Sequence, residues 1–216
     1  IDLLMGGVPC QSFSQAGKRK GINDKRGKLI LNFIELVDKL DPNIFLIENV
    51  KGLKSHNKGE TLKFILNEFN KLNRFNIKYQ VLNSNDYNVP QKRERLIIVG
   101  TNKRIEKEFN FPQKQSFKPV LKDVLMDCPT SPGLKYNEIK KKLFELIPED
   151  GCWINLPVEL QKKYLGNSYY SGGGKRGILK RLSMDKPSLT LLTTPSQKQT
   201  ERCHPLEIRP LQILEY

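Results

Sequence analysis

The sequence predicts an α/β protein with a mostly parallel, doubly wound sheet and a second, smaller and irregular domain. Short apolar runs bounded by turn residues indicate buried strands. Apolar residues at helical spacing lie between these runs, and alternation of strands with helices is typical of a parallel sheet. After Asn102 this regularity fades and proline becomes frequent. The expected strands cover residues 1–5, 44–47, 77–82 and 96–99.

Each element has its own signal. The first strand, residues 1–5, is mostly apolar and is followed by two glycines. A helix is expected over 26–41, because apolar side chains recur at spacings of three and four residues and a proline follows its end. The strand 44–47 is wholly apolar. A second amphipathic helix over 62–72 then leads to the last two strands.

Composition excludes several classes of protein. The 216 residues include 37 Lys and Arg against 23 Asp and Glu, a net charge of +14 that favours a polyanionic partner such as nucleic acid. An apolar share of 38 % indicates a globular chain. No apolar run approaches the roughly 18 residues of a membrane span. The four cysteines lack the spacing of a disulfide framework or zinc site, so we expect a reducing, cytoplasmic location and no metal.

The first candidate functional residue is Cys10, in a polar loop where the first strand ends. In open α/β sheets, ligands bind beyond the carboxyl ends of the strands. Basic residues follow, including Lys18 and Arg26, and positive potential favours the reactive thiolate. An inert, half-buried thiol is the usual state of a lone cysteine. The position and the basic neighbours favour a nucleophile here.

A second candidate, Glu48, ends the strand 44–47. A carboxyl group buried there costs free energy unless it is paired or protonated. Parallel strands joined by one helix are usually neighbours, so Cys10 and Glu48 should project into the same crevice. The alternative is that Glu48 caps the following turn.

A third signal is the run Gln91-Lys92-Arg93-Glu94-Arg95 before the last strand. If the strand already begins there, Gln91, Arg93 and Arg95 lie on one face, because side chains alternate along a strand. Two guanidinium groups would then stand beside the crevice. The alternative is an ordinary solvated surface.

A cysteine nucleophile, a carboxylic acid and guanidinium groups are together what methylation of cytosine at C5 requires. Addition of a thiolate to C6 makes C5 electron-rich, provided that an acid donates a proton or a strong hydrogen bond to N3. Arginine can hold the base and steady the carboxylate. The base must also leave the duplex to be reached.

The blocks Pro9-Cys10-Gln11, Glu48-Asn49-Val50 and Gln91-Lys92-Arg93-Glu94-Arg95, in this order, resemble the signature blocks of bacterial DNA (cytosine-5-)-methyltransferases of restriction–modification systems. The resemblance covers 2–100 almost without a gap and resumes at 197–205. It implies a methyltransferase-type sheet, S-adenosylmethionine as cofactor and double-stranded DNA as partner.

The resemblance also implies roles for single residues. Cys10 would be the nucleophile and Glu48 the partner of cytosine N3, with Arg93 and Arg95 supporting the pocket. The residues implied to contact DNA are Gln11, Ser14, Lys18, Arg26, Asn49 and Gln91.

By the same resemblance, Pro9 and Leu29 would lie against the cofactor. The catalytic domain would cover 1–112, the variable target-recognition domain 113–200, and 201–216 would return toward the catalytic domain. Within 171–202, seven basic residues against two acidic ones suit contact with DNA phosphates.

Some family features are absent from this chain. The opening Phe-x-Gly-x-Gly cofactor block and the closing block are missing, so we expect a fragment that is inactive alone. In Gln212-Ile213-Leu214-Glu215 the family's usual Thr and Arg are also missing. One alternative is therefore a non-catalytic DNA-binding remnant. The other is an RNA cytosine-5 methyltransferase, although the Cys-Phe-Thr stretch of that branch is absent. Cys203-His204 lacks a second pair that would complete a metal site.

Overall fold

The computed structural model describes residues 1–8, 28–171, 177–195 and 197–216. The chain divides into two compact units, each described here by itself. Unit 1 spans Ile1–Asn83 and Glu94–Lys114, and unit 2 spans Ser84–Arg93 and Gln115–Tyr216. The segment Ser84–Arg93, expected within the first domain, thus groups with the second.

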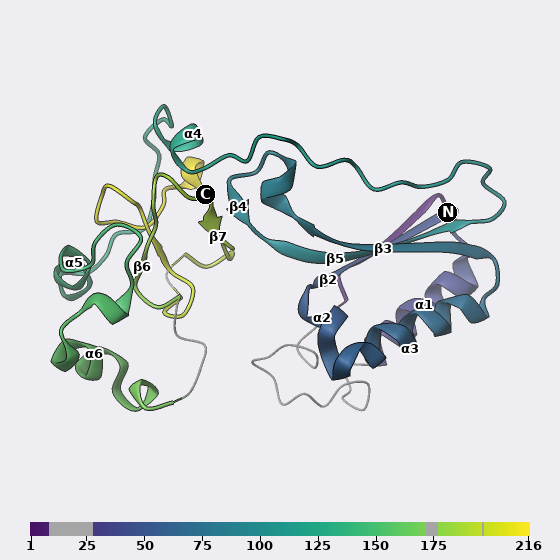
Figure 1. Ribbon diagram of the computed structural model, residues 1–216, viewed down its shortest axis with the longest axis horizontal. Helices are drawn as coiled ribbons and strands as arrows, with labels where there is room; N and C mark the ends of the chain where they lie inside the picture. Colours follow the sequence, from purple (N-terminus) through teal and green to yellow (C-terminus); the bar gives the residue numbers. More distant parts are fainter. Residues whose placement is uncertain (9–27, 172–176, 196) are drawn as a thin grey trace. The chain divides into compact units, whose positions relative to one another are not determined.

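Unit 1 is built on a sheet with the strand order β1 (Leu3–Gly6), β2 (Ile44–Val50), β5 (Glu94–Asn102) and β3 (Phe75–Asn83). β1 pairs in parallel with β2, whereas β5 runs antiparallel to both of its neighbours. Three strands therefore share one direction and β5 runs against them (Figure 1). The predicted fold class, α/β with a mostly parallel sheet, is confirmed.

The reversed direction of β5 follows from the short connection before it. Between β3 and β5 the chain passes only through Ser84–Arg93, which holds the 3-10 turn η3 (Ser84–Tyr87) and the two-residue strand β4 (Gln91–Lys92). A parallel return needs a crossover of about a dozen residues or more, usually a helix. Without such a helix the chain returns antiparallel.

Helices α1 (Lys28–Leu40) and α3 (Glu60–Lys71) cover one face of this sheet (Figure 1). They correspond to the helices predicted from spacing. Phe45 of β2 is fully buried beneath them and stacks on Phe69 of α3, with ring centroids 4.4 Å apart. Burial of one such ring contributes about 1.5–3 kcal/mol. Gly100 of β5 is required beside it, because a Cβ there would lie 2.0 Å from the Phe45 ring.

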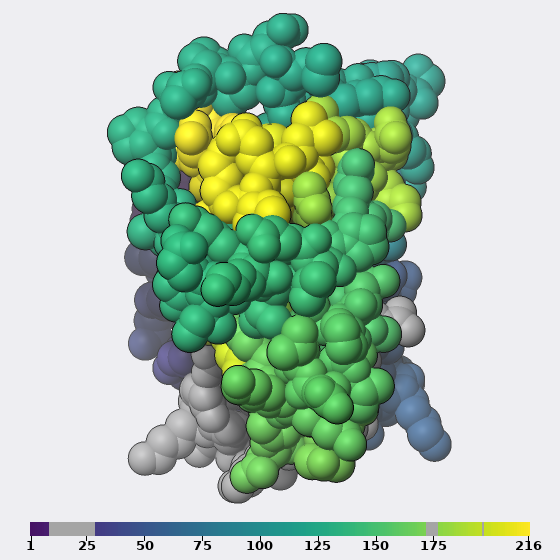
Figure 2. Space-filling view, turned by 90° about the vertical axis from the view of Figure 1, so that its left-hand side faces the viewer, coloured from purple at the N-terminus to yellow at the C-terminus, as the bar shows by residue number. Residues whose placement is uncertain are grey.

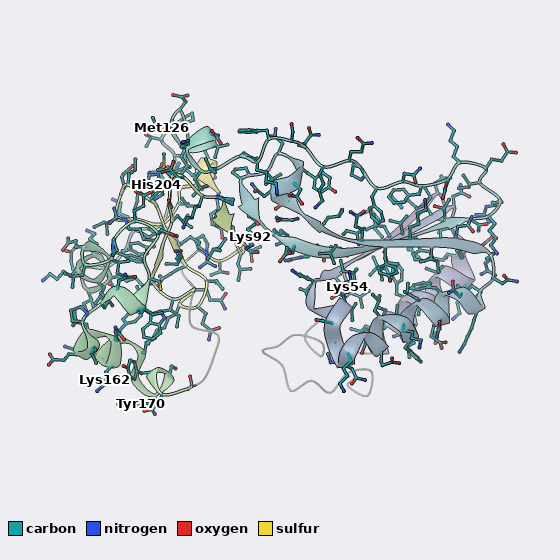
Figure 3. The ribbon with its side chains drawn as sticks, in the orientation of Figure 1. Lys54, Lys92, Met126, Lys162, Tyr170 and His204 are labelled. Atoms are coloured by element: carbon teal, nitrogen blue, oxygen red, sulfur yellow. The ribbon has the colours of Figure 1, made fainter. Side chains whose placement is uncertain are left out.

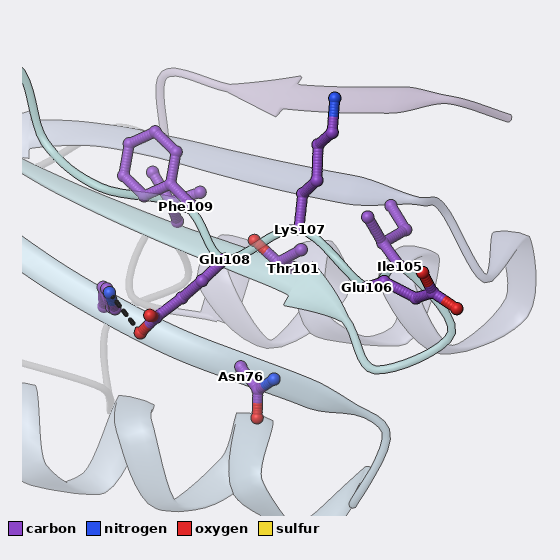
Figure 4. A pocket seen from close by; sticks show the side chains of 9 residues that line it. Asn76, Thr101, Ile105, Glu106, Lys107, Glu108 and Phe109 are labelled. Carbon is purple, nitrogen blue, oxygen red and sulfur yellow. Dashed lines mark ion pairs between the residues drawn. The ribbon is translucent and has the colours of Figure 1, made fainter.

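The opposite face of the sheet carries a small pocket of about 70 Å³. Its lining includes Asn76, Thr101 and Phe109, and the dashed line in Figure 4 marks its ion pair between Lys78 and Glu108, 2.6 Å long. Thr101 lies near the end of β5 and pairs with Ile44 at the start of β2. The pocket is therefore at the end of the sheet away from Glu48. β1 forms the sheet edge, with Leu3 and Met5 half exposed or more.

Unit 2 is less regular, as the sequence predicted for the second part of the chain. It combines short helices with pairs of two-residue strands around two apolar clusters, one of them centred on the fully buried Phe144, Ile147 and Leu179. Figure 2 shows the C-terminal residues in yellow, bordered by green residues of the same unit. Its elements are α4 (Lys122–Leu125), α5 (Glu138–Glu145), α6 (Val158–Leu165), β4 paired with β7 (Ser188–Leu189), and β6 (Lys180–Arg181) paired with β8 (Arg202–Cys203).

A buried ion pair joins α5 to the segment before β8. The side chain of Glu201 has no exposed surface, and its Oε2 lies 2.5 Å from Nζ of Lys140. The Tyr164 hydroxyl of α6 donates to the other carboxylate oxygen over 3.5 Å. Burial raises the pKa of the Glu201 carboxyl above its usual value, against the opposing effect of Lys140. A single carboxylate thus contacts two helices of unit 2.

Replacing Lys140 by methionine is expected to lower the free energy of unfolding by about 3 kcal/mol at neutral pH, because it leaves a buried carboxylate unpaired. A glutamate whose pKa is higher in the folded state stabilises the fold at pH values below its unfolded pKa of about 4.3. This stabilisation is lost as the pH rises through the folded pKa. The deficit of Lys140→Met should therefore shrink as pH falls toward 4. Urea unfolding across pH measures it.

Lys141→Met is the matched control, because Lys141 pairs with the exposed Glu138 on the same helix. An exposed pair of this kind contributes about 1 kcal/mol or less. The double variant Lys140→Met, Glu201→Leu should recover most of the lost stability. Equal deficits for Lys140→Met at acid and neutral pH would contradict the assignment.

Candidate active site

The pairing of β2 with β5 brings Glu48 and Arg95 together. Val50 is the pairing partner of Arg95, and Glu48, two residues earlier, lies diagonally across on the same face. Arg95 Nε donates a hydrogen bond to Glu48 Oε1 over 2.7 Å. Glu48 lies within β2, two residues before its end, so the strand positions its side chain rather than a loop.

The Glu48–Arg95 pair is only partly withdrawn from water. Exposed fractions of the side chains are 39 % for Glu48 and 21 % for Arg95, so a ligand can reach the carboxylate. A second hydrogen bond, from Arg95 Nη1 to the Glu94 carbonyl at 2.9 Å, helps fix the guanidinium. Lys51 and Glu94 form an adjacent ion pair at 2.7 Å. Neither Lys51 nor Glu94 was assigned a role from the sequence.

Asn49 points to the opposite face from Glu48 and is 2 % exposed. Its Nδ2 donates to the carbonyl of Val8 over 3.2 Å, and its Oδ1 accepts from the Val50 backbone N–H at 2.9 Å. The end of β2 is thereby tied to the residue directly before Pro9. This contact connects the strand of Glu48 to the start of the segment that carries Cys10.

Gln91 and Arg93 do not share a strand with Arg95. β4 ends at Lys92, Arg93 lies in the break, and β5 begins at Glu94. The chain turns between the two strands, because β4 pairs with β7 and the Arg93 backbone N–H donates back to the Gln91 carbonyl at 3.1 Å. The condition for a common face, a strand running from Gln91 onward, is therefore not met. Both residues belong to unit 2.

The remaining predicted site residues divide into two groups. Leu29 lies in the first turn of α1 and is 41 % exposed, so its side chain is accessible to a ligand. The others lie outside the described residues, and their predicted roles remain predictions. They are Pro9, Cys10, Gln11, Ser14, Lys18 and Arg26.

The basic residues of 171–202 are not all available to a partner. Lys180 is bound to Asp150 over 2.6 Å with a 15 % exposed side chain. Arg181 donates to the carbonyl oxygens of Pro205 and Ile147, and Arg202 is buried. These basic side chains form contacts within unit 2. Fewer positive charges of 171–202 are therefore available for DNA phosphates than the sequence count predicted. No spacing in the sequence signals such contacts, because their partners are distant along the chain.

Two general findings limit the kinds of site. Within the described ranges, no group of three or more His, Cys, Asp or Glu side chains is placed to hold a metal ion. None of the helices in that part of the chain is both long enough and apolar enough to cross a membrane.

Comparison with known proteins identifies close relatives. The model of the family described as C-5 cytosine-specific DNA methylase matches residues 1–216. The chain is 50 % identical over 220 residues to the Type II methyltransferase M.Sau96I of Staphylococcus aureus, covering 100 % of this chain and 51 % of that protein. It is 44 % identical over 225 residues to M.Eco47II of Escherichia coli, covering 100 % and 54 %. The chain thus spans about half the length of these relatives.

Solved structures show a similar fold at low sequence identity. One, named as a DNA modification methyltransferase encoded within an E. coli prophage, matches with a TM-score of 0.59 and 23 % identity, covering 98 % of this chain and 66 % of that one. The methyltransferase EhMeth of Entamoeba histolytica matches with a TM-score of 0.53 and 20 % identity, covering 98 % and 57 %. Both similarities support the fold alone.

Proposed function

Because this chain belongs to the C-5 cytosine-specific DNA methylase family, we propose that the protein containing it methylates C5 of cytosine within a specific duplex DNA sequence. The observation that carries the proposal is the arrangement at the end of β2. Arg95 holds a reachable carboxylate, Glu48, while Asn49 ties the same strand to the residue before Pro9-Cys10. The relatives carry the name of Type II methyltransferases, which supports a role in a restriction–modification system.

In this proposal Cys10 is the nucleophile. Its thiolate adds to C6 of the cytosine, and the electron pair of the C5–C6 bond becomes available at C5. After C5 has been methylated, loss of the C5 proton expels the thiolate and restores the aromatic ring. The residues after Cys10 include several lysines and arginines, and positive potential favours the thiolate.

Glu48 serves cytosine N3 in this proposal. Its carboxyl group donates a proton or strong hydrogen bond to N3 as negative charge develops on the ring during addition of the thiolate. Arg95 holds Glu48 Oε1 at 2.7 Å and so orients the group on its strand. Arg95 acts through Glu48, which makes it a positioning residue. Asn49 positions Val8, and through it the start of the nucleophile segment.

The proposed methyl donor is S-adenosylmethionine, which supplies an electrophilic methyl group when bound. Leu29 fits a contact with it, because 41 % of this residue is exposed at the start of α1, after the β1–α1 connection. Turns at the carboxyl ends of strands are where open α/β sheets bind nucleotides and related ligands. Pro9 is the second proposed contact.

Duplex DNA is the proposed substrate, with unit 2 supplying most of the recognition surface. The target cytosine leaves the base stack to reach Glu48, because C6 and N3 are inaccessible within a duplex. Gln11, Ser14, Lys18, Arg26 and Gln91 are the remaining proposed DNA contacts, together with basic residues of unit 2.

The test uses the full-length protein that carries this chain. With labelled S-adenosylmethionine, methyl transfer to duplex DNA is expected to exceed transfer to transfer RNA by at least about 10²-fold, since a few kcal/mol of differential binding gives that ratio. Transfer to RNA instead would favour the RNA methyltransferase. Sequence-specific DNA binding with no transfer would favour the non-catalytic remnant.

A further inference from the structure

A lysine-rich segment connects β2 to α3 directly after the candidate active site. It comprises residues 51–59, here called the lysine turn, and consists of Lys51, the short helix α2 (Gly52–Ser55) and the 3-10 turn η2 (His56–Gly59). It contains three lysines and no acidic residue. Lys51 pairs with Glu94. Among the residues that the structure describes, no carboxylate lies within ion-pair distance of the exposed Lys54 or Lys58.

The backbone of the lysine turn is strained. Asn57, Lys58 and Gly59 have φ values of +48°, +56° and +92°, three left-handed residues in a row. Glycine adopts this region without penalty and asparagine tolerates it, but a lysine there crowds its Cβ against the carbonyl oxygen. Such conformations persist only where the surroundings impose them, and they cluster at functional sites.

Contacts on both sides impose this conformation. Leu53 of α2 is fully buried in the core of unit 1, and the backbone N–H of His56 donates to its carbonyl. His56 Nδ1 lies 2.7 Å from Thr61 Oγ1 in the first turn of α3. The lysine turn is thus fixed to the core before the strained residues and to α3 after them. Because the backbone of the lysine turn is already fixed, binding a partner costs less conformational entropy.

The lysine turn also lies at the end of the sheet that carries the candidate site. Lys51 follows Glu48 by three residues, and its partner Glu94 is the neighbour of Arg95, which holds Glu48. Figure 3 shows Lys54 on α2, at this end of β2. A DNA strand carries a phosphate about every 3.4 Å along the helix axis. A duplex that delivers a base to Glu48 therefore brings phosphates to this surface.

We propose that the lysine turn binds the phosphate backbone of the DNA strand beside the target cytosine, through Lys54 and Lys58. The inference rests on the proposed function and adds a contact surface from unit 1. Phosphate contacts fix the register of a protein on DNA and carry no base information. The lysine turn therefore contributes affinity and positioning for target and non-target duplexes alike.

The test measures DNA affinity of the full-length protein against salt concentration, with target and non-target duplexes. In the double variant Lys54→Gln, Lys58→Gln the negative slope of log affinity against log salt should become shallower by about two. At low salt, affinity for both duplexes should fall by the same factor. Lys39→Gln, Lys71→Gln is the control, because these exposed lysines lie in the last turns of α1 and α3. The control should keep the wild-type slope.

Two glycine variants separate charge from backbone strain. Lys58→Gly and Asn57→Gly should each raise Tm by about 1–3 °C, since glycine accepts the left-handed backbone. Only Lys58→Gly should also make the negative salt slope shallower, by about one. If the slope of the double variant is unchanged while the wild-type protein methylates DNA, this inference is overturned and the proposed function stands. A wild-type protein that does not bind duplex DNA would overturn both.

Discussion

Replacing Cys10 by alanine in the full-length protein is expected to lower methyl transfer to DNA by at least about 10⁴-fold, because the covalent route through C6 is lost. DNA affinity should change little, since removing one sulfur removes no phosphate contact. Single-turnover methylation and a gel-based binding assay measure the two effects separately. A duplex carrying 5-fluorocytosine at the target position should trap the wild-type protein covalently, because fluorine at C5 cannot leave as a proton does.

Cys152→Ala provides the matched control for this experiment. Cys152 is a free, partly buried thiol in unit 2, just before the 3-10 turn Trp153–Asn155. Its removal should leave both methylation and trapping at wild-type levels. Covalent trapping that survives Cys10→Ala would show that another nucleophile performs the addition and would end the proposed mechanism.

Replacing Glu48 by glutamine should slow the chemical step by about 10²–10⁴-fold, the contribution of a positioned general acid. Glutamine has nearly the same shape and can still accept the hydrogen bond from Arg95 Nε. It can also donate a hydrogen bond to N3, but it cannot deliver a proton there. The loss should therefore appear in the single-turnover rate at saturating DNA far more than in DNA affinity.

Glu94→Gln is the control for Glu48. Glu94 occupies the neighbouring position on β5 and pairs with the exposed Lys51, so its charge is removed close to the same site. Loss of such an exposed pair should change the rate by less than about tenfold, as its contribution is about 1 kcal/mol or less. If Glu48→Gln keeps the wild-type single-turnover rate, Glu48 is a structural acid and not the partner of N3.

The elements of unit 1 could be predicted because their signals are local. Helical spacing between 26 and 41 predicts α1, and the apolar run at 44–47 predicts β2, since burial of one face dictates the periodicity of each element. The boundaries moved by a few residues. Apolar content alone predicts that β2 ends at Glu48. In the structure β2 extends to Val50, so Glu48 lies within the strand.

The candidate site could be predicted only in part. The sequence identifies Glu48 and Arg95 through the order of their blocks, and the structure pairs them. It does not indicate that Gln91 and Arg93 leave the strand, because that depends on pairing of β4 with β7, almost a hundred residues later. Side-chain alternation predicts which residues share a face only within a strand, and the start of a strand depends on the segment with which it pairs.

Four features follow from the amino-acid sequence alone: the α/β class, the order of the strands along the chain, the basic character and the blocks that carry Cys10 and Glu48. Each of these depends on residues that are neighbours in the chain. Three other features became visible in the folded chain: the reversed direction of β5, the burial of Glu201 against Lys140 and the left-handed backbone of the lysine turn. The Lys140–Glu201 pair joins segments 61 residues apart, β5 takes its direction from pairing with β2 and β3 after a short connection, and the core position of Leu53 together with the His56–Thr61 contact holds the left-handed residues. In each case the free energy of packing and pairing exceeds local preference.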